Sequence, residues 1–378
     1  MKVQTLVNDG AGWSAALPRV DGPETLVIVF GARRCDDDTR WLADLRSYYP
    51  SSIIVGCSTS GEIVGEQLLD DTIAVAVVEF ESSQLRLATV SSSDFVDSRA
   101  AGCALGQQLA ADDLASMLVF ADGISTNGSA LVAGLQHAAG AETPVSGGLA
   151  GDGDRFEQTW VLSGDRFGAD LIAAVGLYGP SVRSGYGSRG GWVPFGPERV
   201  VTQATANVLA ELDGQPALPL YRSYLGDLAD GLPASALFFP LCIWPADRSS
   251  APLVRTVLGV DTDDNSMTFA GDIPQGWHAQ LMIANPEDLI DAAAEAANDS
   301  NGAAEVAGDS LALAVSCVGR RLVLGGSADD ELLSVVDGLS ERTQVIGFYS
   351  YGEISSANGI GELHNQTMTV TTIREARG

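Results

Sequence analysis

The feature that most constrains the fold is a short pattern that occurs three times in the sequence. In each copy, an apolar run typical of a buried strand leads into a glycine-rich polar turn. Residues 53–63 read Ile-Ile-Val-Gly-Cys-Ser-Thr-Ser-Gly-Glu-Ile, and residues 345–354 read Val-Ile-Gly-Phe-Tyr-Ser-Tyr-Gly-Glu-Ile. A weaker copy, residues 144–152, reads Pro-Val-Ser-Gly-Gly-Leu-Ala-Gly-Asp. Repeats of this kind restrict the chain to folds built from equivalent units.

The segments around the three copies also correspond. Each copy follows an apolar run and an expected helix, and each precedes another strand-like run; the earlier runs are 26–30, 117–120 and 311–318, and the later runs are 72–80, 170–178 and 367–373. The period is too long for a solenoid. We therefore predict an α+β fold with layered mixed β-sheets flanked by helices, internal pseudo-repeats and two domains.

The charge of the chain limits its partners. The 378 residues include 49 acidic and 21 basic side chains, so the formal net charge is −28. Such a surface repels nucleic-acid phosphates and anionic membranes. No apolar run approaches the roughly 20 residues that span a bilayer, and the N-terminus does not resemble a secretory signal. We expect a cytoplasmic protein that neither binds nucleic acid nor inserts into a membrane.

The cysteines and histidines give no local metal signature. The five cysteines lie far apart without a Cys-x-x-Cys pair, and the three histidines are too widely separated for a zinc motif. Irregular spacing also argues against a disulfide framework, which is consistent with a reducing compartment. We predict no metal site.

The first turn carries groups suited to a small polar ligand. Glycine permits a close approach of the backbone, and successive N–H groups with the hydroxyls of Ser58, Thr59 and Ser60 can form a cradle. The alternative is a tight turn into the next element. A second polar segment follows the run 117–120 and precedes an expected helix. There Asp122 and Asn127 are ligand candidates, although Asn127 can equally cap the helix.

The first turn also raises the alternative of an enzyme. Its residues resemble a nucleophile elbow, with Cys57 or Ser58 as the nucleophile of a hydrolase or transferase. The Gly-x-Ser-x-Gly pattern requires glycine where this chain has Ser60, and a thiol nucleophile requires a histidine nearby in space. We therefore predict no catalytic residue and no enzymatic activity.

Together these segments resemble the FIST family, sensory proteins with an N-terminal FIST domain and a C-terminal FIST-C domain. The resemblance is carried by residues 55–63 and, in the second half, by 211–217 with Tyr221, 239–241, Arg255 with 258–261, 269–272, 347–354 and 365–367. It extends from about Glu24 to Thr372. With a boundary at Gly196-Pro197, it divides the chain into a lead (1–23), a FIST N-terminal domain (24–197) and a FIST-C domain (198–378).

The resemblance implies a signal-transduction input module that binds a small ligand, with amino acids as the proposed class. We expect a stand-alone sensory module that signals to a separate protein, such as a histidine kinase or a cyclic-di-GMP enzyme. Some members are haem proteins that sense nitric oxide, so a haem-binding nitric-oxide sensor is the alternative, with His137 or His364 as the candidate axial ligand. Haem apart, we expect no cofactor.

An amino-acid ligand needs donors for its carboxylate and an acid for its ammonium group. Backbone N–H groups of the turns and Arg255 would bind the carboxylate, one of the acids would bind the ammonium group, and tyrosines would stack on the ligand. The alternative is that each Gly-acid pair repeats because the fold repeats, with the acid capping a neighbouring turn. The predicted ligand-binding set is Cys57, Ser58, Thr59, Ser60, Gly61, Glu62, Asp122, Asn127, Gly148, Asp152, Arg255, Tyr349, Tyr351 and Glu353.

Overall fold

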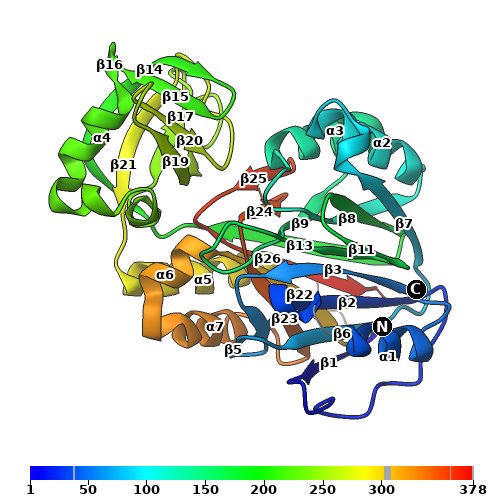
Figure 1. Ribbon diagram of the computed structural model, residues 1–378. Coiled ribbons are helices and arrows are strands. Elements are labelled where there is room, and N and C mark those ends of the chain that lie inside the picture. Colours follow the sequence, from blue (N-terminus) through cyan, green and yellow to red (C-terminus); the bar gives the residue numbers. More distant parts are fainter. Residues whose placement is uncertain (37–38, 302–307, 358, 377–378) are drawn as a thin grey trace.

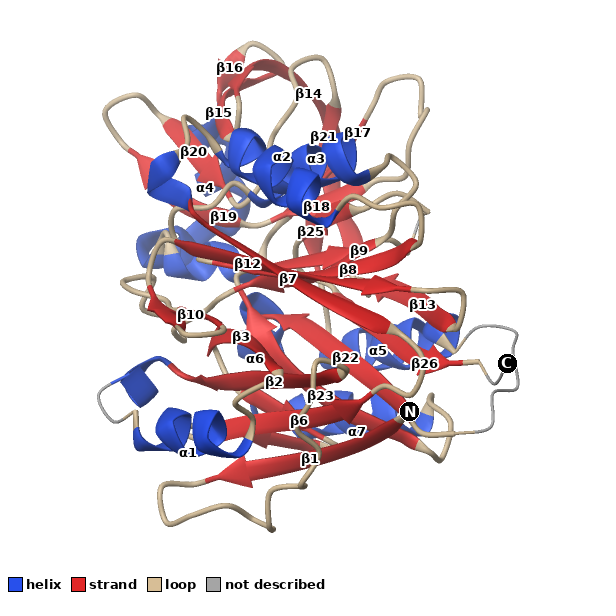
Figure 2. Cartoon of the chain, turned by 90° about the vertical axis from the view of Figure 1, so that its right-hand side faces the viewer, coloured by secondary structure: helices blue, strands red, loops and turns tan. Residues whose placement is uncertain are grey.

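The chain folds into a main body and an inserted lobe (Figure 1). The computed structural model describes residues 1–36, 39–301, 308–357 and 359–376. The main body, formed by the described residues of 1–192 and 284–376, contains three six-stranded sheets, and the inserted lobe, residues 193–283, contains a separate eight-stranded sheet. Helices lie outside the sheets of the body (Figure 2). The predicted α+β fold, with layered mixed sheets, flanking helices and two domains, is confirmed.

The three sheets of the body share one strand order. The first three strands pair antiparallel, the third and fourth run parallel, and a two-stranded hairpin completes each sheet. The first sheet contains β1 (Lys2–Asn8), β6 (Ile73–Glu79), β2 (Thr25–Ala32), β3 (Ile53–Thr59), β10 (Val161–Ser163) and β11 (Arg166–Gly168). The second contains β7 (Gln84–Ser91), β12 (Leu171–Tyr178), β8 (Leu114–Ala121), β9 (Val145–Leu149), β24 (Gly352–Ser355) and β25 (Glu362–His364). The third contains β13 (Val182–Arg189), β26 (Met368–Glu375), β22 (Ser310–Cys317), β23 (Thr343–Ser350), β4 (Glu62–Val64) and β5 (Gln67–Leu69).

Each repeated unit contributes its hairpin to the sheet of another unit. The hairpin β4–β5 completes the third sheet, β10–β11 completes the first, and β24–β25 completes the second. The first unit thus gives its hairpin to the third, the third to the second, and the second to the first. The predicted pseudo-repeats are confirmed, and they form three interlocked units. The expected domain boundary after residue 197 falls within β14 (Val193–Thr205). Strands from before and after this boundary pair in one sheet, as β4 does with β23.

The inner faces of the three sheets share one hydrophobic core. At its centre the ring centroid of Phe30 lies 5.5 Å from that of Phe120 and 4.6 Å from that of Phe348. Helices bury their apolar sides against the outer faces, so the central strands are apolar on both faces. These helices are α1 (Arg40–Tyr48) on the first sheet, α2 (Ser98–Leu109) and α3 (Gly128–Ala139) on the second, and α5 (Pro286–Ser300) and α7 (Ala328–Asp337) on the third.

The inserted lobe has its own hydrophobic core, built from its sheet and one helix, α4 (Ala217–Leu225). Turn residues in left-handed conformations, such as Asp213 and Gly214, connect its strands closely. The remaining strands of its sheet are β15 (Val208–Leu212), β16 (Gln215–Pro216), β17 (Leu241–Trp244), β18 (Leu253–Arg255), β19 (Val257–Asp261), β20 (Ser266–Phe269) and β21 (His278–Ile283).

A buried ion pair fixes the two segments that join the lobe to the body. Arg320, in α6 (Val318–Leu324), and Glu331 are both completely buried, and their closest N–O distance is 2.6 Å. The same guanidinium donates to the carbonyl oxygen of Gly190, just before the lobe, and to that of Leu289, just after it, at 2.8 Å in the second case. Both joining segments are therefore anchored to one side chain of the body.

Candidate functional site

The three repeated turns meet where the three sheets join. We call residues 57–62, 148–153 and 349–353 the junction. The Ser60 N–H donates to the Tyr349 carbonyl oxygen at 2.8 Å, and the Gly151 N–H donates to the Ser58 carbonyl oxygen at 3.0 Å. The Tyr351 N–H donates to the carbonyl oxygen of Leu149 at 3.2 Å. The structure thus brings the predicted turns together, with backbone N–H groups of each turn donating to carbonyl oxygens of another.

The glycines that begin the turns are required by close backbone approach. A Cβ atom at Gly56 would lie 1.7 Å from the Val29 carbonyl oxygen, and one at Gly347 would lie 1.7 Å from that of Ala314. Gly147 occupies the corresponding place in the middle copy, where the distance would be 1.9 Å. The repeated glycine therefore serves the packing of neighbouring strands.

The acid of the first turn is bonded within the protein. Glu62 is completely buried, accepts a hydrogen bond from the Thr59 hydroxyl, and accepts two from Thr72, from its N–H at 3.1 Å and its hydroxyl at 2.9 Å. Burial raises the pKa of Glu62 to about 7, and nearby Asp70 acts in the same direction. This carboxyl group connects its own turn to the start of β6.

The acid of the third copy repeats this arrangement. Glu353 is completely buried and accepts hydrogen bonds from the Ser350 hydroxyl at 2.9 Å and from the N–H and hydroxyl of Thr367 at 3.1 and 3.0 Å. Burial raises the pKa of Glu353 to about 8, although its hydrogen bonds and the charge of Arg320 oppose the shift. Both glutamates thus join a turn to the following strand.

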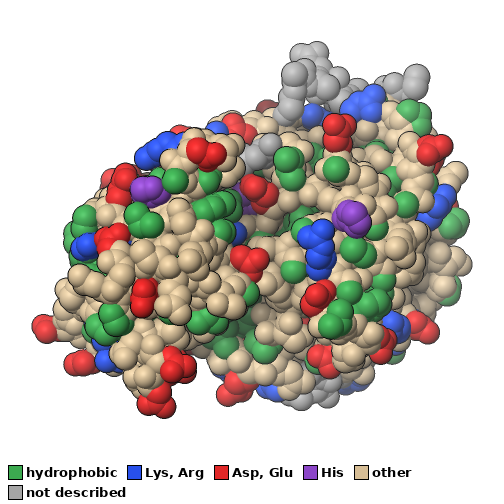
Figure 3. Space-filling model, turned by 90° about the horizontal axis from the view of Figure 1, so that it is seen from above, with side chains coloured by type: hydrophobic (Ala, Val, Ile, Leu, Met, Phe, Trp, Pro, Cys, Tyr) green, Lys and Arg blue, Asp and Glu red, His purple; other side chains and the backbone are tan. Residues whose placement is uncertain are grey.

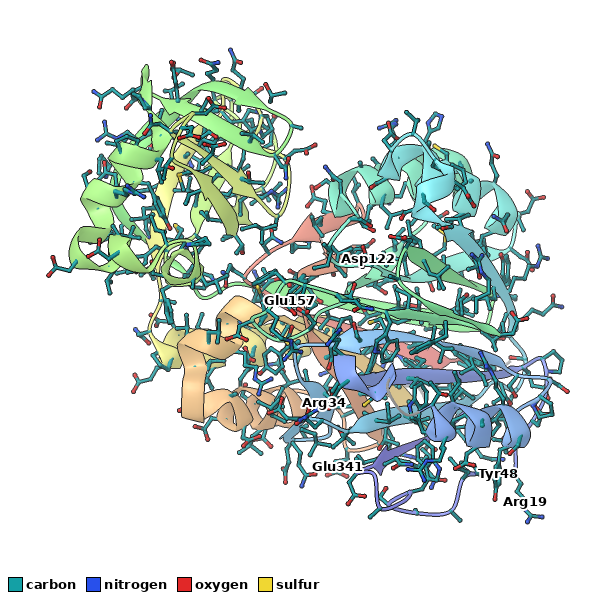
Figure 4. The ribbon with its side chains drawn as sticks, viewed as in Figure 1. Arg19, Arg34, Tyr48, Asp122, Glu157 and Glu341 are labelled. Atoms are coloured by element: carbon teal, nitrogen blue, oxygen red, sulfur yellow. The ribbon has the colours of Figure 1, made fainter. Side chains whose placement is uncertain are left out.

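The two predicted aspartates are also satisfied by neighbouring groups. Asp152 accepts hydrogen bonds from the Tyr351 hydroxyl and from the N–H groups of the loop that follows, including that of Glu157 at 3.0 Å. Burial opposes the charge of Asp152, but these hydrogen bonds outweigh it and lower the pKa. Asp122, directly after β8, accepts from the N–H and hydroxyl of Ser125 at 2.7 and 2.6 Å (Figure 4 labels Asp122 and Glu157).

The other predicted junction residues also lie inside the protein. Tyr349 donates its hydroxyl to Glu331 at 2.7 Å, and the hydroxyl oxygen of Ser58 accepts from the Trp160 N–H at 3.0 Å. Cys57 is completely buried, and burial raises the pKa of its thiol. A buried thiol of raised pKa carries little thiolate, which is the reactive form. Gly61 and Gly148 belong to the same packed backbone.

A pocket of about 300 Å³ lies between the inserted lobe and the body. Figure 3 shows the surface hollowed between these two parts, with hydrophobic side chains along the hollow. We call this the interlobe pocket. Its lining residues are Ser129, Val132, Ala133 and Gln136 of α3, Ile360–Leu363 of the body, and Ile243, Leu253, Arg255, Asp272, Pro274 and Trp277 of the lobe.

Arg255 is the cation of the interlobe pocket. It is 4% exposed, and in the described part of the chain its hydrogen bonds all go to backbone carbonyl oxygens: that of Leu363 in the body at 3.1 Å, and those of Val254 and Asp272 in the lobe, both at 3.3 Å. Burial lowers the pKa of Arg255 to about 10, while the charges of Asp272 and Glu362 oppose this shift. The guanidinium remains charged at neutral pH.

Asn127 connects the pocket to the start of α3. Its side-chain oxygen accepts from the Ala130 N–H at 3.0 Å, which is the expected helix cap. Its side-chain nitrogen donates to Asp272 of the lobe at 3.1 Å. Of the predicted ligand-binding set, Arg255 lines the interlobe pocket and Asn127 lies beside it, whereas the other residues lie at the junction or, for Asp122, after β8.

Several of the buried polar atoms without a hydrogen-bond partner in the described structure lie along the contact between lobe and body. They are the hydroxyls of Thr126, Ser129 and Thr256, Nε2 of His364 and both amide atoms of Asn365. Their segments touch, because Arg255 bonds to the Leu363 carbonyl and Gly128 packs against the Leu363 side chain. Buried polar groups normally have partners, so this contact is suited to a polar occupant.

The charge state of His364 follows from its surroundings. Burial, and then the charge of Arg255, lower the pKa of His364 to about 4, so its imidazole is neutral at neutral pH. Its Nε2 is therefore a hydrogen-bonding group without charge beside the guanidinium.

Sequence reasoning did not select Asp272, Glu362, Trp277 or Asn365 as site residues. Asp272 and Asn365 lie in segments that carried the family resemblance, and this was the one signal that pointed to them. Glu362 and Trp277 have no local motif, and folding alone brings them to the pocket.

Within the described ranges, no three His, Cys, Asp or Glu side chains are grouped so as to hold a metal ion. None of the helices described is both long and apolar enough to cross a membrane.

Both halves of the chain match known protein-domain families. Residues 25–215 match the FIST N domain, and residues 217–356 match the FIST C domain. The chain is also 25% identical over 363 residues to uncharacterised proteins of Mycobacterium tuberculosis strains CDC 1551 and H37Rv. Each alignment covers 92% of this chain and 91% of the relative.

Proposed function

Because the chain belongs to the FIST family, we propose that it is a sensory protein that binds an amino acid in the interlobe pocket and signals to a separate protein. FIST domains are associated with sensory signal transduction and are not known as enzymes. The single observation that carries the proposal is a buried arginine, Arg255, between two parts of the molecule in a pocket of ligand size.

The carboxylate of the ligand would bind to Arg255. A guanidinium presents several N–H groups in a planar fork that matches a carboxylate, and a charge-assisted bond in a water-poor site is strong. Carbonyl oxygens accept hydrogen bonds from Arg255 without neutralising its charge. A bound anion would add to the compensation that the charges of Asp272 and Glu362 give this buried guanidinium.

The ammonium group of the ligand would face Asp272 and Glu362. Both line the pocket, and both are close enough to influence the pKa of Arg255. Acid and base therefore lie within one small volume, as a zwitterion requires. The acids that we expected from the turns, such as Glu62 and Glu353, are bonded inside the junction.

Binding between the two parts gives a route to signalling. A ligand that touches both Arg255 of the lobe and α3 of the body favours one arrangement of lobe and body over others. The joining segments are held by Arg320, so a change in the arrangement of lobe and body would pivot on these segments. The partner that reads this change would be a histidine kinase or a cyclic-di-GMP enzyme.

Thermal-shift measurements with the twenty amino acids test the proposal. Ligand at 100 times its Kd stabilises a protein by about 2.7 kcal/mol, so at least one amino acid should raise the Tm of the wild type. The substitution Arg255→Met should abolish this rise, while Arg222→Met, at an exposed position of α4, should preserve it. Stabilisation that survives in Arg255→Met would contradict the assignment of the site.

An absorption spectrum of the purified protein tests the alternative of a haem sensor. The proposal predicts no Soret band. A Soret band that shifts with nitric oxide would replace the amino-acid sensor by a haem sensor, with His364, which is buried, ahead of His137, which is exposed.

A further inference from the structure

We propose that the ligand of the interlobe pocket is an α-amino acid with an uncharged aliphatic side chain of about the size of valine or leucine. This inference rests on the proposed function and specifies the ligand class of the same site. It comes from the way polar and apolar groups are divided around the pocket.

The charged groups of the pocket all lie close together. Arg255 bonds to the carbonyl oxygens of Leu363 and Asp272, and Glu362 precedes Leu363 in the chain. The carboxylate and ammonium groups of an α-amino acid are also close together, since both are attached to one carbon atom. The charged cluster therefore accounts for the main-chain part of the ligand and leaves the rest of the pocket for its side chain.

The remaining walls are predominantly apolar and belong to both parts of the molecule. Val132 of α3 is 2% exposed and Ile243 of β17 is completely buried, so both lie behind the wall and offer a ligand little or no surface. The half-buried Leu253 and Trp277 of the lobe and the exposed Ile360 of the body therefore form the apolar surface that a ligand can touch. The packed lobe core behind Leu253 and Trp277 holds these two side chains in place.

Among the residues that line the pocket, only Gln136 and Ser129 carry uncharged polar side chains, and the unpartnered atoms of Thr126, Thr256, His364 and Asn365 belong to residues outside this lining. Gln136 lines the pocket, but its amide nitrogen donates to the carbonyl oxygens of Ala141 and Thr143 at 3.4 and 3.3 Å. Ser129 offers one hydroxyl. A charged or amide side chain would lose its water here without gaining a full set of partners, which is costly. An aliphatic side chain loses nothing and gains apolar contact.

The volume sets an upper limit on the ligand. A pocket of about 300 Å³ is at the small end of the range for ligand sites. It suits one amino acid better than a peptide or a nucleotide. Because Ile360 and Trp277 come from different parts of the molecule, an aliphatic side chain that contacts both would also hold lobe and body together.

Isosteric pairs of amino acids test this inference directly. Valine and threonine have nearly the same shape, as do leucine and asparagine, and each pair differs mainly in polarity. Calorimetric titration of the wild-type protein should give a Kd at least about tenfold lower for valine than for threonine, and for leucine than for asparagine. Equal or tighter binding of the polar member, or tightest binding of glutamate or lysine, would overturn the inference.

Variants of the pocket wall provide an independent readout. Trp277→Ala should weaken leucine binding by roughly tenfold by removing an apolar wall. Ile360→Ser changes a pocket residue that is 60% exposed, so folding should be unaffected, and it should weaken leucine binding by a smaller factor. Leu228→Ser, at a 53% exposed position outside the pocket, should leave leucine binding unchanged. Unchanged leucine binding in both pocket variants would contradict the proposed wall.

The outcomes separate this inference from the proposed function. If glutamate or lysine binds and Arg255→Met abolishes that binding, the amino-acid sensor stands and the aliphatic specificity is wrong. If none of the twenty amino acids binds, the proposed function fails and this inference fails with it. If leucine binds but 4-methylpentanoate, which lacks the ammonium group, binds equally well, Asp272 and Glu362 do not recognise the ligand and the α-amino-acid class is overturned.

Discussion

The junction and the interlobe pocket are both polar regions in the interior, but they differ in how their polar groups are paired. At the junction, Glu62 and Glu353 each accept hydrogen bonds from a hydroxyl group of their own turn and from the N–H and hydroxyl of a threonine before the next strand. The turns also bond to one another. At the interlobe contact, Arg255 bonds only to carbonyl oxygens in the described part of the chain, and nearby His364 and Asn365 have unpartnered atoms there. The repeated residues maintain the architecture, and the ligand site that we propose is formed by residues that do not repeat.

This difference has a physical basis. A repeated position recurs because each unit must solve the same packing problem, as Gly56 and Gly347 show. A ligand site needs groups whose partners are absent until the ligand binds, and such groups lower stability in the empty protein. At the interlobe contact, this cost is seen in the unpartnered atoms of Thr256, His364 and Asn365.

The largest effect that would test the comparison is expected at the junction glycines. Gly56→Ala should destabilise the protein by about 3 kcal/mol or more, because the added methyl group would overlap the Val29 carbonyl oxygen. Gly326→Ala is the matched control, since a Cβ there meets nothing within 4 Å, and it should change stability by less than about 0.5 kcal/mol. Urea denaturation measures both. Equal stabilities would mean that the junction is not tightly packed.

A second effect concerns pH. The pKa of Glu62 is about 7 in the folded protein, above the ordinary value of 4.5, so between these values the folded state binds more protons than the unfolded state. Stability contributed by this group is present below pH 4.5 and decreases as pH rises to about 7; for Glu353, with a pKa of about 8, the decrease extends to about pH 8.

The substitutions Glu62→Gln and Glu353→Gln should therefore flatten the decline of stability between pH 5 and 8. Each group accounts for a slope of at most about 1.4 kcal/mol per pH unit. Chemical denaturation across this pH range measures the slope, and Glu341→Gln, at an exposed position, serves as the control. If the slope of stability against pH in both variants equals that of the wild type, the pKa values of Glu62 and Glu353 are not raised by burial in the junction.

The smallest effect is expected where the pocket alone is altered. Arg255→Met should change the free energy of unfolding of the ligand-free protein by less than about 1 kcal/mol, because the loss of hydrogen bonds to carbonyls is offset by removal of a buried charge. Urea denaturation without ligand tests this. A loss comparable to that of Gly56→Ala would make Arg255 a structural residue.

The sequence allowed the repeated units to be predicted because strand-like runs and Gly-acid turns are local patterns. It did not allow prediction of the hairpin exchange, because the pairing of β4 with β23 joins segments at opposite ends of the chain. For the site, glycine, hydroxyl and acid residues suit a packed turn as well as a ligand cradle, so composition could not distinguish the two. Arg255 was selected with its family motif, whereas Glu362 and Trp277 reach the pocket only through folding.

The most direct test compares ligand-induced stabilisation in two variants. The amino acid that raises the Tm of the wild type most is added to Glu62→Gln and to Arg255→Met, and each Tm is compared with that of the same variant without ligand. The account predicts the full wild-type shift in Glu62→Gln and none in Arg255→Met. A shift that disappears in Glu62→Gln and persists in Arg255→Met would place the ligand at the junction and contradict the account.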